Sequence, residues 1–252
     1  MNGAALESMV LGVAVIFARM GGVFLIAPGL SSARIPVKVR LFVALAVSWA
    51  ITPLVIGDAA AAVDGTEPAR ILAIIGTETA IGLLIGLLAR LLLMALETLS
   101  VGVANMIGLG GIPSLSVDST EPTPAAATLF TVTGVTVIFL ADLHYGILRA
   151  LLGSYAVVRP GAGLDPQAAL VAVADQIGAA FVVALRIAAP FFIYAVVVNF
   201  AMGIVNKLSP QIPVFFVALP FMIAGGLVLM AFAVREMMIA FADAFAQLGA
   251  GL

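Results

Sequence analysis

The single histidine of the chain, His144, is the first residue to test for catalysis, because it lies in the segment LADLHYGILRA two residues after Asp142. A histidine acts as a general base when a neighbouring carboxylate holds its ring in place. On a helix, residues i and i+2 point about 200° apart, so Asp142 cannot orient His144. The sequence also lacks the H-E-x-x-H, G-x-S-x-G and P-loop spacings. These observations argue against an enzyme.

Ionisable residues inside apolar runs are the second kind of candidate, and we expect Glu78, Asp142 and Arg186 to be buried charges. Charges at membrane depth normally face protein or water, because exposure to lipid is costly. A secondary transporter would gather such residues near broken helices at the membrane midplane. Asp175 and Arg186 lie on one helical face about 16 Å apart, which indicates a polar stripe rather than a compact binding site. A carrier of an ion or small molecule is the alternative function.

The composition indicates a membrane protein. Of 252 residues, 63% are hydrophobic and 10% are charged, whereas soluble domains have about 25% charged residues. The net charge is −2 and no Lys/Arg-rich run occurs, so nucleic acid is not expected as a partner. There is no cysteine, which excludes disulfides and thiolate metal sites.

Long runs rich in Leu, Ala and Gly predict an all-α fold with about six helices, some of them kinked. The expected helices cover residues 5–27, 37–56, 69–104, 126–152, 166–208 and 213–247. The run 69–104 would be about 50 Å long, against a hydrocarbon core of about 30 Å. Pro190 would kink or break the run 166–208. Helices packed against other subunits therefore fit better than six spans surrounded by lipid.

Two patterns of small and polar residues predict close helix packing. Gly82 and Gly86 form a G-x-x-x-G motif, which lets another helix backbone approach. A second set falls at i, i+3, i+4 and i+7 of a later helix and consists of Asn199, Met202, Gly203 and Asn206. We expect both sets to lie in subunit interfaces.

A polar, glycine-rich segment, NMIGLGGIPSLSVDSTEPTPA from Asn105 to Ala125, separates two apolar runs. A connector between helices needs only a few residues. The segment could be a slack surface loop or a working part. Its first half, 106–115, is apolar and contains three glycines, whereas 116–124 is polar and contains Pro122 and Pro124.

Several blocks in order along the chain resemble the FliR family of flagellar biosynthetic proteins, which is related to the T-type export subunit of injectisomes. The resemblance begins with RIPVKVR (34–40) and continues with Glu78-x-x-x-Gly82-x-x-x-Gly86 and FLADLH (139–144). Its most specific block is VNFAMGIVNKLSPQIPVFF (198–216). The match covers nearly the whole chain.

This resemblance implies a structural and gating subunit of the type III protein export channel. It would join P-type and Q-type gate subunits in a spiral hetero-oligomer, together with the B-type switch subunit, in the bacterial inner membrane at the flagellar basal body. Unfolded exported proteins would pass through. Residues 1–160 would correspond to the P-type subunit and residues 161–252 to the Q-type subunit, as halves of one structural unit. A flagellar system and an injectisome both remain open.

The family also has a loop that plugs the closed pore, and the matching segment here is 105–123. The resemblance assigns the plug to Met106, Ile107, Gly108, Leu109, Gly110, Gly111, Ile112, Pro113 and Leu115. The apolar side chains would exclude water and the glycines would supply a flexible backbone. Pro210 and Phe215 join the expected subunit interfaces. No cofactor or metal is expected.

Overall fold

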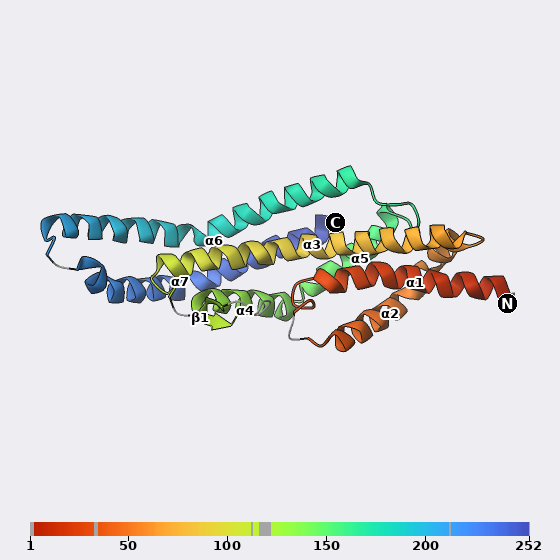
Figure 1. Cartoon of the computed structure of the whole chain (residues 1–252), viewed down its shortest axis with the longest axis horizontal. Helices are drawn as coiled ribbons and strands as arrows, with labels where there is room; N and C mark the ends of the chain where they lie inside the picture. Colours follow the sequence, from red (N-terminus) through yellow and green to blue (C-terminus); the bar gives the residue numbers. More distant parts are fainter. Residues whose placement is uncertain (1–2, 33–34, 112, 116–121, 212, 252) are drawn as a thin grey trace. The chain divides into compact units, whose positions relative to one another are not determined.

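The computed structural model describes residues 3–32, 35–111, 113–115, 122–211 and 213–251. The predicted all-α class is confirmed. The helices are α1 (Gly3–Ile26), α2 (Val37–Val63), α3 (Pro68–Met106), α4 (Ala125–Leu140), α5 (His144–Val157), α6 (Pro166–Leu208) and α7 (Val214–Gly251), as Figure 1 shows. Two strands of three residues, β1 (Pro113–Leu115) and β2 (Pro122–Pro124), form an antiparallel pair that the sequence did not indicate.

Five described helices are long and apolar enough to cross a membrane: α1, α2, α3, α6 and α7. The pair α4 and α5 would make a sixth span, bent by 64° at its break. The single predicted helix over 126–152 is therefore wrong. The chain turns at Asp142, whose φ of 57° is left-handed, a conformation that Asp and Asn adopt more easily than most side chains.

Prolines inside the helices do not end them. Pro53, Pro190 and Pro220 lie within α2, α6 and α7. Of the expected kink or break at Pro190, a break is not present, since α6 continues from Pro166 to Leu208. Each proline still removes one backbone donor from its helix.

The chain divides into two compact units that alternate along the sequence. The first consists of Met1–Leu91, Asp142–Ile177 and Phe245–Leu252. Its core includes Val15 and Ile16 of α1, Ala59 and Val63 of α2, and Ile74 of α3. The first half of α1 therefore packs on the last turns of α2.

The second unit consists of Leu92–Ala141 and Gly178–Ala244. Here α4 lies close to the last part of α3 and to α7, because a Cβ on Gly134 would be 2.8 Å from Leu96 and 3.6 Å from Phe241. Phe191 and Phe241 are fully buried. Gly134 thus allows α3 and α7 to pack closely against α4.

Candidate functional site

Glycines bring α1 and α3 into backbone contact within the first unit. A Cβ on Gly22 would be 2.5 Å from the carbonyl oxygen of Thr79, and one on Gly86 would be 2.9 Å from the carbonyl oxygen of Val23. A Cβ on Gly82 would overlap the carbonyl oxygen of Arg19. The G-x-x-x-G motif therefore packs on α1 of the same chain. The motif signals a close approach but not which helix approaches, and the expected role of these glycines in a subunit interface stays a prediction.

This crossing surrounds a fully buried ion pair. The Nε atom of Arg19 donates a hydrogen bond to Oε2 of Glu78 over 2.6 Å, and both side chains are 0% exposed. Removing two charges from water is expensive, and their attraction offsets this cost only when the remaining polar atoms are also satisfied. The surroundings of the pair meet this condition.

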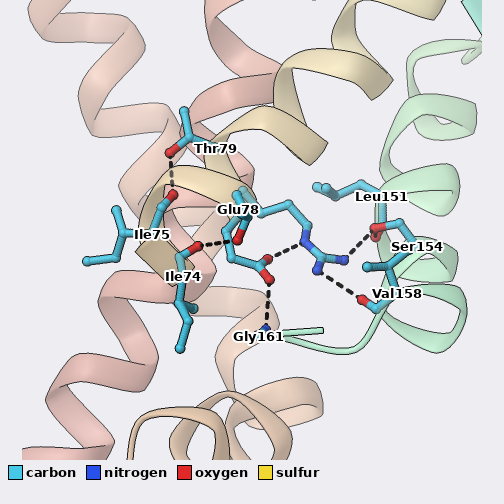
Figure 2. A network of polar contacts seen from close by, with 10 residues as sticks. Ile74, Ile75, Glu78, Thr79, Leu151, Ser154, Val158 and Gly161 are labelled. Carbon is cyan, nitrogen blue, oxygen red and sulfur yellow. Dashed lines mark hydrogen bonds and ion pairs between the residues drawn. The ribbon is translucent and has the colours of Figure 1, made fainter. Parts of the chain in front are cut away.

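The other polar atoms of the pair bind α5 and the turn after it (Figure 2). Nη1 of Arg19 donates to Oγ of Ser154 at 2.9 Å, and Nη2 donates to the carbonyl oxygen of Val158 at 2.9 Å. The guanidinium carbon lies 4.0 Å from the ring centre of Tyr155, a favourable cation–π distance. The backbone N–H of Gly161 donates to Oε1 of Glu78 over 3.2 Å. We call Arg19, Glu78, Ser154, Tyr155 and Gly161 the ion-pair network.

The network joins three helices and a turn at one point. Gly161 has a φ of 79°, and a Cβ there would be 3.2 Å from Ala62 of α2. Glycine is thus required both by the backbone conformation and by the close approach. Every charged atom of Arg19 and Glu78 has a hydrogen-bond partner, which suits a structural role rather than proton transfer to a substrate; the buried hydroxyl of Tyr155 has no partner in the described part of the chain. In the described part of the chain, no three acidic or histidine side chains form a metal-binding group.

The predicted plug begins with a helix stop in the second unit. The N–H of Leu109 donates to the carbonyl of Ala104, and the N–H of Gly108 donates to the carbonyl of Asn105. With Gly108 at a φ of 80°, these bonds form a Schellman motif that ends α3. Gly108 therefore has a defined capping role, whereas the sequence analysis expected it to provide flexibility.

The residue before this glycine anchors the segment to α7. Ile107 is fully buried, and a Cβ on Gly226 would overlap its side chain. On a neighbouring position of α7, Gly225 leaves room for the ring of Tyr194, whose hydroxyl donates to the carbonyl of Met222 over 2.9 Å. The start of the predicted plug is thus packed against a helix. Met106, Leu109 and Gly110 are partly exposed, and Gly111 is exposed.

The far end of the predicted plug is also paired. Pro113 lies opposite Pro124 and Leu115 lies opposite Pro122 in the β1–β2 ladder. Ile112 lies outside the described residues. The described part of the segment is therefore held at both ends, by the cap of α3 and by the strand pair.

Comparison with known proteins identifies the family. The family described as "Bacterial export proteins, family 1" matches residues 10–248. The chain belongs to this family. The predicted FliR-family membership is confirmed, since the flagellar biosynthetic protein FliR of Caulobacter vibrioides is 28% identical over 251 residues, 98% of each chain. Yop proteins translocation protein T of Yersinia pestis is 29% identical over 150 residues, 58% of this chain and 57% of that one, and the protein of that name from Yersinia pseudotuberculosis gives the same values.

In this member of the export-protein family, the other expected buried charges are not buried by the chain itself. Glu78 is buried, but Asp142 and Arg186 are exposed. Asp142 lies in the turn between α4 and α5, and Arg186 lies on an open face of α6. The chain alone therefore buries only Glu78 of these three, and burial of Asp142 and Arg186 against other subunits stays a prediction.

The remaining interface candidates lie on open faces of α6 and α7 and in the turn between them. The exposed residues are Asn199, Gly203, Asn206, Pro210 and Phe215, while Met202 is half-buried. Asn199 donates to the carbonyl of Ala195 on its own helix. No described atom lies within 4 Å of a Cβ on Gly203, so another backbone has room to approach there.

Arg19 is the important residue that the sequence analysis did not select. The signal was a cation within the first apolar run, but its partner lies 59 residues away. Sequence spacing gives no means of pairing residues on different helices.

Proposed function

We propose that the chain is a structural and gating subunit of a flagellar-type (type III) protein export channel. The observation that carries this proposal is the similarity to flagellar biosynthetic protein FliR over 98% of both chains. The shorter match to a Yop protein translocation subunit supports a role shared by the two kinds of export system. The five apolar helices support a multi-pass membrane protein, and we place it in the bacterial inner membrane.

The proposed partners are the P-type, Q-type and B-type subunits of the export gate. These partners are supported by the large apolar surface that α6 and α7 leave exposed. Within the most apolar 18-residue stretch of each helix, only 28% of the residues of α6 and 17% of those of α7 are buried. Exposed side chains on these helices include Val197, Phe200, Phe216 and Phe232. Partner helices or lipid must cover such a surface in a membrane. In this proposal, residues 1–160 correspond to the P-type subunit and 161–252 to the Q-type subunit.

The proposed gate is the segment from Met106 to Leu115. Partly exposed Met106 and Leu109 could narrow a channel, and apolar constrictions exclude water and ions. Anchoring through Ile107 and the strand pair would keep the segment in place when the channel is closed. Export of an unfolded protein would require this segment to move aside.

Assembly is tested by extracting the tagged full-length chain with its co-expressed partners in mild detergent. The proposal expects one large complex with several P-type and Q-type subunits for each copy of this chain, measured by native mass spectrometry. A monomer that carries a small solute into liposomes would instead support the transporter alternative.

Gating is tested by replacing Met106 and Leu109 with asparagine in the assembled complex. The expected result is a leak of ions through membranes that contain the complex, with assembly unchanged. The matched control is Leu140→Asn, since Leu140 is 82% exposed at the end of α4. Membranes that stay tight with both gate substitutions would contradict the assignment of the gate to this segment.

A further inference from the structure

A groove lies between the diverging halves of α1 and α2 in the first unit. Where Gly12 of α1 meets the last turns of α2, the two helices are close, since a Cβ on Gly12 would be 3.0 Å from the backbone of Ala60. At Gly21, in contrast, a Cβ would have no neighbour within 4 Å. The groove that results has a volume of about 470 Å³, within the range of about 300–1,000 Å³ typical of ligand sites. The two helices separate toward their connection (Figure 1).

The walls of this groove are almost wholly apolar. They include Phe17, Leu25, Val37 and Leu41, and α3 contributes Ile75 to the lining. Leu25, Val37 and Leu41 are 55%, 74% and 52% exposed, so the groove is open to the surroundings of the chain. In a membrane, an open apolar groove between helices cannot stay empty or hold water.

One end of the groove carries positive charge. Among the described residues, Arg40 is the only charged one that lines it, and exposed Lys38 lies two residues earlier. Val37, which also lines the groove, is the first residue of α2, and no side chain caps this helix start. The unbonded N–H groups of a helix N-terminus attract anions.

The guanidinium of Arg40 has a donor without a partner. Its Nη2 atom donates to the carbonyl of Ser32 over 2.9 Å. Its Nε atom is buried and has no hydrogen-bond partner among the described residues. A buried donor without an acceptor is costly and uncommon. Arg40 as a whole is half-buried and lines the groove, so its positive charge is available to an anionic group there.

We propose that this groove binds one anionic phospholipid, with an acyl chain between α1 and α2 and its phosphate beside Arg40, Lys38 and the start of α2. An apolar groove with charge at one end matches an amphiphile of opposite charge. Basic pockets between membrane helices recognise anionic lipid headgroups in this way. The site is separate from the proposed gate, which lies in the second unit.

The test uses native mass spectrometry of the full-length chain, alone and in its complex, after addition of phosphatidylglycerol or phosphatidylcholine with identical acyl chains. Arg40 alone should strengthen retention of phosphatidylglycerol over phosphatidylcholine roughly fivefold, as expected for about 1 kcal/mol per basic residue near an anionic lipid. Arg40→Gln should remove this preference, while Arg40→Lys should keep most of it. Inorganic phosphate at the same concentration should not displace the lipid.

Gly21→Leu provides a second, charge-neutral variant. A Cβ at Gly21 meets no described atom within 4 Å, and Gly21 lines the groove, so the leucine should occupy the groove and lower retention of both lipids. Gly57→Leu is the matched control, because Gly57 is an exposed α2 glycine that has no neighbour within 4 Å and does not line the groove.

Two results would overturn the proposal even if the Arg40 variants fail to fold. Equal lipid retention by Gly21→Leu and Gly57→Leu would show that the lipid binds elsewhere. Loss of complex assembly in Gly21→Leu, with unchanged lipid retention by the isolated chain, would assign the groove to a helix of a partner subunit. Neither result bears on the gate experiment, which has its own variants.

Discussion

Removing one member of the Arg19–Glu78 pair should destabilise the chain far more than its single hydrogen bond suggests. Glu78→Leu removes the carboxylate and its charge and leaves an apolar side chain. The guanidinium of Arg19 is 0% exposed, so it would remain as an uncompensated buried charge. Breaking a buried pair in this way costs about 3–5 kcal/mol of the free energy of unfolding. Arg19→Met leaves the opposite charge and should cost a similar amount.

The double variant Arg19→Met/Glu78→Leu separates the charge effect from the packing effect. It contains no unpaired charge, and Ser154 keeps its bond to the carbonyl of Leu151. The remaining loss comes from the carbonyl of Val158 and the N–H of Gly161, each about 1–3 kcal/mol if left unsatisfied. The two single effects therefore exceed the double effect by about 3 kcal/mol, near the upper end of couplings measured between contacting residues.

The free energy of unfolding can be measured by far-ultraviolet circular dichroism while SDS is titrated into mild-detergent micelles. Glu236→Gln is the matched control, because Glu236 pairs with Arg235 at 3.1 Å but their side chains are 72% and 80% exposed. An exposed pair contributes little, and this substitution should change stability by less than about 0.5 kcal/mol. Strictly additive effects of the two substitutions at the buried pair would refute the reasoning, because they would mean that the charges do not stabilise each other.

Three further predictions concern glycines and use the same unfolding measurement. Gly82→Val should lower the free energy of unfolding by about 1–3 kcal/mol, because its side chain would overlap the backbone of α1. Gly76→Ala is the control: a Cβ there has no neighbour within 4 Å, so it should stabilise α3 by about 0.5–1 kcal/mol. Equal effects of the two substitutions would contradict the described crossing of α1 and α3. Gly226→Ala should destabilise the second unit, because the added Cβ would overlap the Cβ of Ile107. Adding Ile107→Gly removes that Cβ, so the combined loss should be smaller than the sum of the two single losses; strictly additive losses would mean that the two residues do not touch. Gly108→Ala should lower the free energy of unfolding by about 1–2 kcal/mol, because Gly108 has a positive φ. Gly108→Asn should lower it less; a larger loss for Asn than for Ala would contradict the role of Gly108 as the C-cap of α3.

The sequence predicted the helices well where their ends carry local signals. Pro166 and Leu208 bound α6 as expected, and a proline suits the first turn of a helix. The break between α4 and α5 was missed because Ala141, Asp142 and Leu143 contain neither glycine nor proline. The helix ends there at Asp142 in the left-handed conformation, which Asp adopts more easily than most residues but not often enough for the sequence alone to predict it.

The candidate site was less predictable, because its parts are distant in sequence. The G-x-x-x-G motif correctly indicated a close backbone approach, but the approaching helix is α1. The role of Gly108 could have been recognised, since a glycine just beyond an apolar run is a common helix stop. The pairing of Arg19 with Glu78, and of both with α5, depends on how the helices pack, which spacing along the chain does not encode.

The ion pair also has a consequence for how the chain is made. Arg19 is synthesised 59 residues before Glu78 and 135 residues before Ser154. At about 5–20 residues per second, translation separates the first two by roughly 3–12 s. During this interval the first helix carries a cation that resists entry into hydrocarbon. We therefore expect α1 to reach its final depth only after α3 emerges from the ribosome, because only then is the partner of Arg19 present.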